Sequence, residues 1–173
     1  MKDKNKIIAF IAVIAILFIG FFLYGTPDKN TDKEITDNIT QFAGISALET
    51  PEISYDFGNI SMKNGNVSKI FKVINPTDKD IKVPSLTTSC MCTTAYIIKE
   101  DGSRSRPFGM PGHGRAVPQA NAIVKAGGAL DIEVVYDPNA HGPAGIGRIE
   151  RSVFLEDESG EALEFRFRAT VTP

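Results

Sequence analysis

The sequence predicts an all-β domain, a β-sandwich of seven or eight antiparallel strands, preceded by one N-terminal transmembrane helix. An uncharged apolar run stands near the start of the chain, and a polar stretch without sustained periodicity follows it. Beyond position 50, short segments alternate apolar and polar residues between Gly, Pro, Asn and Asp. Such alternation is typical of strands with one buried face. We therefore divide the chain into a basic start with a membrane anchor (1–24), a polar linker (25–50) and a sandwich (51–173).

The apolar run spans residues 7–24, from Ile7 to Tyr24, and three lysines precede it, at positions 2, 4 and 6. A helix of this length would measure roughly 27 Å, close to the thickness of a bilayer's hydrocarbon core. Basic residues before the run predict a cytoplasmic N-terminus. A cleaved signal peptide is the alternative, but the small residues that cleavage requires are missing around positions 21–26. We expect a single-pass protein of the cell membrane, anchored in the lipid bilayer, with an extracytoplasmic C-terminal domain.

The clearest strand pattern lies near the C-terminus, where apolar residues occupy every odd position from Leu163 to Val171 and polar residues the even ones. The pattern recurs over residues 130–136. It is less regular over residues 52–57, 67–74, 81–85, 93–98, 123–125 and 149–155. This number of short strands, separated by turn-forming residues, is typical of a β-sandwich.

Charge and motifs narrow the functional classes. The formal net charge of −2 provides no basic surface for nucleic acid, so we expect no nucleic-acid partner. The sequence has neither a Gly-x-Ser-x-Gly elbow nor a His-Glu-x-x-His motif, which disfavours hydrolases. We therefore expect a non-enzymatic binding or structural module with a protein partner.

Most charged side chains are expected in solvent. The acidic hairpin at residues 156–161 predicts a solvated tip. Arg104, Arg106 and Arg115 predict a solvated loop, with a small anion-binding patch as the alternative. The arginines at positions 148, 151, 166 and 168 are expected to form exposed charge ladders across two strands.

Both cysteines of the chain, Cys90 and Cys92, stand two positions apart in the motif Ser-Cys-Met-Cys-Thr. Both histidines, His113 and His141, and also Met110 lie in two Gly/Pro-rich loops, at residues 101–120 and 138–147. Thiolate, imidazole and thioether groups are ligands of soft metal ions. An alternative function is therefore a soft-metal site, for copper as Cu(I) in the first place and zinc in the second, built from these five residues.

Two further interpretations of the cysteines stay open. They can pack as small apolar residues or form a local disulfide. They can also act in thiol redox catalysis, although no helix N-terminus or basic neighbour of Cys90 is evident to stabilise a thiolate. If the two cysteines occupy an extended strand, they share one face and Met91 points to the other. The metal hypothesis requires both loops to close over the cysteine motif.

Four motifs in order carry a family resemblance: Asp56-Phe-Gly-Asn-Ile60, Phe71-Lys-Val-Ile-Asn75, Ser89-Cys-Met-Cys-Thr93, and Gly127-Gly128 before Asp131-Ile-Glu-Val-Val-Tyr-Asp137. With them the sequence resembles the DUF1573 family over residues 51–171. The resemblance implies an immunoglobulin-like sandwich of the ASH and HYDIN type and a bacterial setting, but little about function. The sequence departs from the family at Met91, where glycine is common, and in the long insertion at 101–120.

Overall fold

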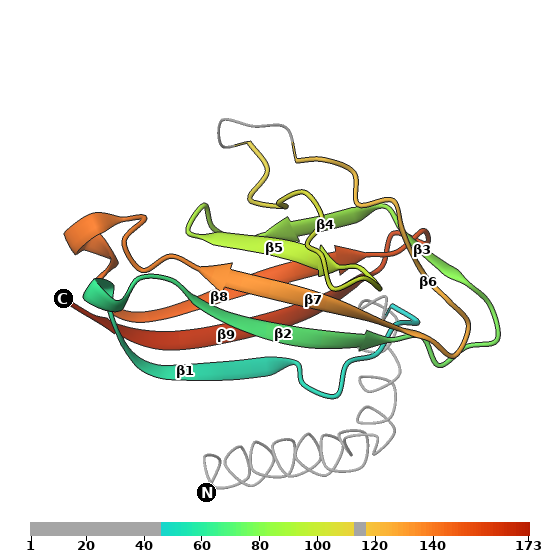
Figure 1. Ribbon diagram of the computed structural model, residues 1–173, viewed down its shortest axis with the longest axis horizontal. Coiled ribbons are helices and arrows are strands. Elements are labelled where there is room, and N and C mark those ends of the chain that lie inside the picture. Colours follow the sequence, from blue (N-terminus) through green and yellow to red (C-terminus); the bar gives the residue numbers. More distant parts are fainter. Residues whose placement is uncertain (1–45, 113–116) are drawn as a thin grey trace, which may run out of the picture. The chain divides into compact units, whose positions relative to one another are not determined.

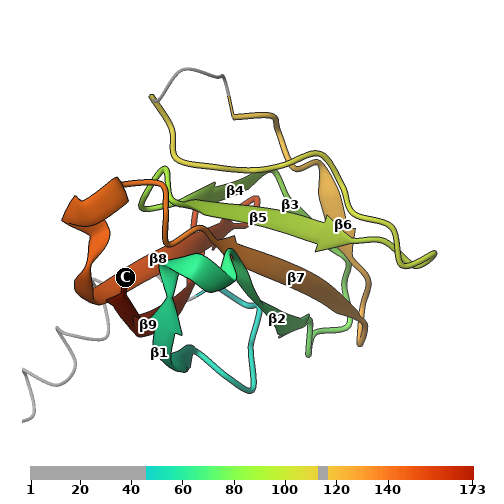
Figure 2. The ribbon, with the colours of Figure 1, turned by 60° about the vertical axis from the view of Figure 1, so that its left-hand side comes forward.

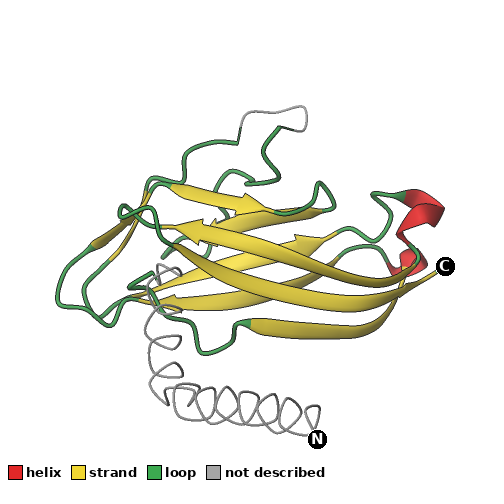
Figure 3. Ribbon diagram, turned by 180° about the vertical axis from the view of Figure 1, so that it is seen from behind, coloured by secondary structure: helices red, strands yellow, loops and turns green. Residues whose placement is uncertain are grey.

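Strands dominate the computed structural model, which describes residues 46–112 and 117–173 (Figure 1). They are β1 (Ser54–Ser61), β2 (Val67–Ile74), β3 (Ile81–Val83), β4 (Ser85–Thr88), β5 (Thr93–Ile98), β6 (Ala122–Val124), β7 (Ala129–Tyr136), β8 (Gly147–Glu156) and β9 (Ala162–Thr172). Two short 3-10 helices, η1 (Met62–Asn64) and η2 (Gly142–Gly145), lie at one end of the strands (Figure 3). The all-β prediction is confirmed. The expected anchor at residues 7–24 lies outside the described residues, and within the described ranges no helix is long and apolar enough to cross a membrane.

The described strands form three sheets. One has the order β1-β9-β8-β4, the second β2-β7-β5, and the third pairs β3 with β6. The prediction of seven or eight antiparallel strands is wrong in two respects, since nine strands are described and β1 pairs with β9 in parallel. Pro84 divides the predicted segment after residue 81 into β3 and β4, because proline cannot donate to a strand ladder. Local sequence patterns do not predict whether β1 pairs in parallel, because its partner strand lies at the far end of the chain.

Aromatic side chains join the two larger sheets across a shared core. The rings of Phe71 on β2 and Phe165 on β9 stack with their centroids 5.1 Å apart. Tyr136 on β7 meets Phe167 on β9 at 5.5 Å. Both β9 phenylalanines are buried, as the alternation in this segment predicts. Burial of each such side chain contributes roughly 1.5–3 kcal/mol, so this layer holds the sheets face to face.

The packed region begins earlier than residue 51. Leu48 is only 1% exposed, and Glu49 exchanges two backbone hydrogen bonds of 2.8 Å with Ile74 at the end of β2. The Ser46 hydroxyl donates a 2.7 Å hydrogen bond to Asp157 in the β8–β9 hairpin. Residues 46–50, which the sequence assigns to the linker, therefore belong to the folded domain. The acidic hairpin is also not solvated throughout, because Asp157 is buried.

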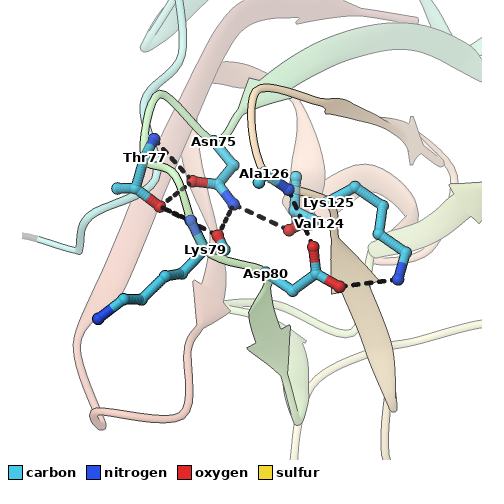
Figure 4. Close-up of polar contacts among 7 residues, drawn as sticks. All are labelled: Asn75, Thr77, Lys79, Asp80, Val124, Lys125 and Ala126. Atoms are coloured by element: carbon cyan, nitrogen blue, oxygen red, sulfur yellow. Dashed lines mark hydrogen bonds and ion pairs between the residues drawn. The ribbon is translucent and has the colours of Figure 1, made fainter.

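A polar turn holds the β2–β3 connection against the β6–β7 connection (Figure 4). The side-chain amide of the fully buried Asn75 donates to the carbonyls of Lys79 and Val124, at 2.7 and 2.9 Å. Its oxygen accepts from the backbone N–H and the hydroxyl of Thr77, at 3.0 and 2.7 Å. Every polar atom of this buried amide is thus paired, as buried amides require.

The first part of the long insertion runs along the outer edge of β5. Ala95 pairs with Phe108, and Ile98 pairs with Arg104. The Arg104 guanidinium, expected in a solvated loop, binds the buried Glu133 carboxylate through two hydrogen bonds of 2.6 and 2.5 Å. This segment therefore covers a strand edge that would otherwise be free to pair with another chain.

Candidate functional site

The two cysteines lie in the turn that carries the chain from β4 in one sheet to β5 in the other. The Thr93 N–H donates to the Cys90 carbonyl at 3.1 Å, and this bond closes the turn. Cys90 and Cys92 form a disulfide with their Cα atoms 5.3 Å apart. The extended-strand arrangement considered for the pair is therefore wrong, because the backbone must reverse here to change sheets. Met91 lies at the apex and is 55% exposed.

The two sulfur atoms have different surroundings. Cys90 is half-buried, and its Sγ accepts a 3.3 Å hydrogen bond from the Cys92 N–H. Cys92 is only 2% exposed. Its Sγ lies 3.7 Å from the Thr93 hydroxyl and 3.3 Å from Nε of Arg151, which donates to it. Cys90 is therefore the less buried of the two residues, and the Cys92 sulfur faces a half-buried cation.

His141 reaches the cysteines from the connection between β7 and β8. The Asp137 N–H donates to the Cys92 carbonyl at 2.9 Å, and this bond ties the start of the connection to the cysteine turn. Asn139 donates its side-chain amide to the Met62 carbonyl of η1 at 2.9 Å. Nε2 of His141 then lies 3.2 Å from Sγ of Cys90. The cysteine turn and η2 lie at the same end of the strands in both views (Figures 1 and 2).

Buried Gly145 allows this close approach. A Cβ atom at position 145 would lie 3.3 Å from Cβ of His141, closer than side chains normally pack. A residue with a side chain would therefore press the histidine away from its present position. Gly145 therefore has a packing role beside His141.

Arg151 is the residue that sequence reasoning missed. Strand pairing places it: Thr88 pairs with Val153, and Ser89 exchanges hydrogen bonds with Ser152, at 2.9 Å in both directions. Its assignment to an exposed charge ladder is wrong, because Arg151 is half-buried with its Nε on a cysteine sulfur. A signal was present in the sequence. Arg151 is in phase with Ile149 and Val153, so period two places it on the inward side of β8.

The three groups are close enough to share one metal ion. The sulfurs of Cys90 and Cys92 and a ring nitrogen of His141 all lie within 4.8 Å of one another. Zinc–sulfur bonds measure about 2.3 Å, so two ligands on opposite sides of one ion lie roughly 4.6 Å apart. Once the disulfide is reduced, small side-chain rotations would bring all three atoms to bonding distance of one ion.

The other two predicted ligands have different outcomes. His113 lies outside the described residues. Met110 follows Gly109, whose carbonyl accepts a 3.2 Å hydrogen bond from the Thr88 N–H, so the loop backbone reaches the strand that leads to Cys90. The role of Met110 as a ligand stays a prediction.

Comparisons with known proteins give a fold and no function. No protein-family model matches the chain, and no curated protein matches it. A protein of unknown function from Porphyromonas gingivalis W83 is similar in structure, with a TM-score of 0.52 and 14% identity over 71% of this chain and 46% of that one. The secreted serine protease VesC from Vibrio cholerae gives a TM-score of 0.45 and 12% identity, over 73% of this chain and 24% of that one. This chain thus spans less than half of either protein, and the first similarity supports the fold alone.

Proposed function

We propose that this protein is a membrane-tethered, extracytoplasmic, immunoglobulin-like domain of the DUF1573 type that acts as a non-enzymatic binding module. We further propose that it binds a soft metal ion, Cu(I) before zinc, through Cys90, Cys92 and His141. One observation carries the metal proposal: the imidazole of His141 lies 3.2 Å from Cys90, although 51 positions separate the two residues in the sequence. The chain has only two cysteines and two histidines, and three of these four residues meet at this turn.

The ligand set favours copper over zinc. Two thiolates and one imidazole satisfy a three-coordinate Cu(I) ion, for which soft sulfur ligands are preferred. Structural zinc sites are four-coordinate, so zinc would need a fourth ligand such as Met110, His113 or water. Two thiolates and Cu(I) together carry one negative charge, and the Arg151 guanidinium beside Cys92 compensates it. Binding requires reduced cysteines, because a disulfide sulfur is not a thiolate ligand.

A Cu(I) competition titration tests the proposal. The reduced full-length chain, kept in detergent without oxygen, competes with a chromogenic Cu(I) chelator. We expect one tightly bound ion per chain, no binding by Cys90→Ser/Cys92→Ser, and weaker binding by His141→Ala. His113→Ala tests the other histidine of the chain, and unchanged Cu(I) binding is expected of the three-ligand site. Lys99→Ala, an exposed change on the surface, is the control. Equal copper binding by the wild type and the double cysteine variant would refute the site.

The tether needs a separate test, because its support is the apolar run at residues 7–24 and the lysines before it. We expect the chain to stay in the membrane fraction after alkaline carbonate extraction. Protease added outside intact cells is expected to degrade the C-terminal domain. Release of the chain by carbonate would contradict the anchor.

A further inference from the structure

We propose that Cys90 and Cys92 are also a two-electron redox couple that exchanges with an external thiol, which attacks Cys90 while Cys92 is the leaving group. This activity concerns the proposed metal-binding cysteines but requires no metal. It rests on the unequal surroundings of the two sulfurs and on the position of Arg151.

Access directs the attack to Cys90. Cys92 is 2% exposed and packs within the hydrophobic core, so an incoming thiolate cannot reach its sulfur. Cys90 is only partly buried, and its neighbours at the surface are the exposed Met91 and the exposed His141. A thiolate from outside therefore meets the sulfur of Cys90 first.

Arg151 stabilises the group that leaves. Breaking the S–S bond places a negative charge on Cys92, and the guanidinium Nε that donates to this sulfur is 3.3 Å away. Arginine stays protonated at all relevant pH values, so this hydrogen bond becomes charge-assisted when the thiolate forms. Thiol exchange is faster when the leaving thiolate is stabilised. Arg151 acts as a positioning and stabilising residue and does not touch the incoming thiol.

The reaction balances without any further reagent. An external thiolate forms a bond to Cys90 Sγ, the Cys90–Cys92 bond breaks, and Cys92 leaves as a thiolate. A second external thiolate then attacks the external sulfur of the mixed disulfide and releases Cys90 as a thiolate. Both cysteines take up a proton, so two external thiols become one disulfide and the protein gains two electrons and two protons. The reverse sequence oxidises the protein.

The surface around Cys90 suits a thiol carried by a protein. Among the described residues, the exposed large apolar side chains are Ile53, Ile70, Met91, Ile123 and Ile146. Met91 lies between the cysteines, and Ile146 follows η2 in the segment that carries His141. An exposed apolar side chain next to a reactive group, here Met91, favours contact with a protein surface. A small thiol such as glutathione would not use it.

The experiment follows reduction of the oxidised full-length chain in detergent, with a chelator present to exclude metal. Reduced glutathione and reduced thioredoxin are the two probes, and reactions are stopped with acid. Mass mapping then identifies the cysteine that carries the probe. We expect the mixed disulfide on Cys90, and slower reduction of Met91→Ser by thioredoxin but not by glutathione. If Met91→Ser is reduced more slowly by both probes, or by neither, the inference that a protein carries the external thiol is overturned.

Variants of Arg151 test the stabilisation of the leaving thiolate directly. Arg151→Ala is expected to slow reduction about tenfold and to lower the reduced fraction at a fixed dithiothreitol ratio, whereas Arg151→Lys restores most of both. Arg148→Ala, on the same strand and exposed, is the matched control. Probe attached to Cys92, or an unchanged rate in Arg151→Ala, would overturn the proposal. His141→Ala separates the two functions, because it should weaken Cu(I) binding and leave the probe directed to Cys90.

Discussion

Reduction of the Cys90–Cys92 disulfide is expected to lower the free energy of unfolding by no more than about 2 kcal/mol. A disulfide stabilises mainly by restricting the unfolded chain, and the restriction grows with the loop that it closes. Here the sequence separation is 2, so the closed loop holds three residues. The loop-entropy relation then gives about 1.6 kcal/mol at room temperature, against roughly 3 kcal/mol for a fifteen-residue loop. A bridge with so small a stabilising effect is suited to opening and closing.

Urea unfolding followed by far-ultraviolet circular dichroism, with and without a phosphine reductant, measures this difference. The Cys90→Ser/Cys92→Ser variant controls for effects of the reductant elsewhere, and its curve should not change. A loss above about 4 kcal/mol on reduction, or unfolding by the reductant alone, would show that the bridge is structural. That result would refute the reasoning for both a reducible metal site and an exchangeable pair.

Three further predictions concern the fold. Asn75→Ala removes the amide that donates to the buried Val124 carbonyl and the half-buried Lys79 carbonyl, and it is expected to cost about 2–4 kcal/mol in urea unfolding. An exposed change such as Lys79→Ala should cost less than about 0.5 kcal/mol. Leu48→Ala is expected to cost about 2–4 kcal/mol, and an effect below about 1 would place residues 46–50 outside the folded domain. Burial alone would raise the pKa of Asp157, but hydrogen bonds from Ser159 and Ser46 outweigh it and hold the pKa below its usual value. The ionised Asp157 carboxylate therefore stabilises the fold at pH values above the pKa that this group has in the unfolded chain. This stabilisation is lost as the pH falls through the lower pKa of the folded state. In Asp157→Asn, the free energy of unfolding in urea should therefore fall less between neutral pH and about pH 3 than in the wild type.

Local patterns predicted the strands well, because the period of two is visible within a few residues. In β9 the alternation from Leu163 onward places Phe165 and Phe167 in the core, as the structure has them. The parallel pairing of β1 with β9 could not be predicted from local patterns, since the register of distant strands depends on packing across the whole domain.

The site was predictable in part. The scarcity of soft ligands predicted a cluster of five residues, and three of them, Cys90, Cys92 and His141, lie together in the structure. His113 lies outside the described residues, and Met110 stays a prediction. The turn that brings the sulfurs together could not be predicted from the sequence, because the backbone reverses there to pass from β4 in one sheet to β5 in the other. Arg151 was overlooked because neighbouring arginines suggested a surface ladder, although its phase on β8 indicated an inward side chain.

The guanidinium and the imidazole at this site come from different kinds of structure. Arg151 belongs to a strand held on both sides by neighbours, whereas His141 belongs to a short connection fixed by a few hydrogen bonds. Substitutions at residues 138–146 can therefore move the imidazole and leave the cation beside Cys92 in place. The proposed affinity for a metal ion and the proposed reactivity toward thiols can in this way change independently over evolution, although both would depend on the same two sulfur atoms.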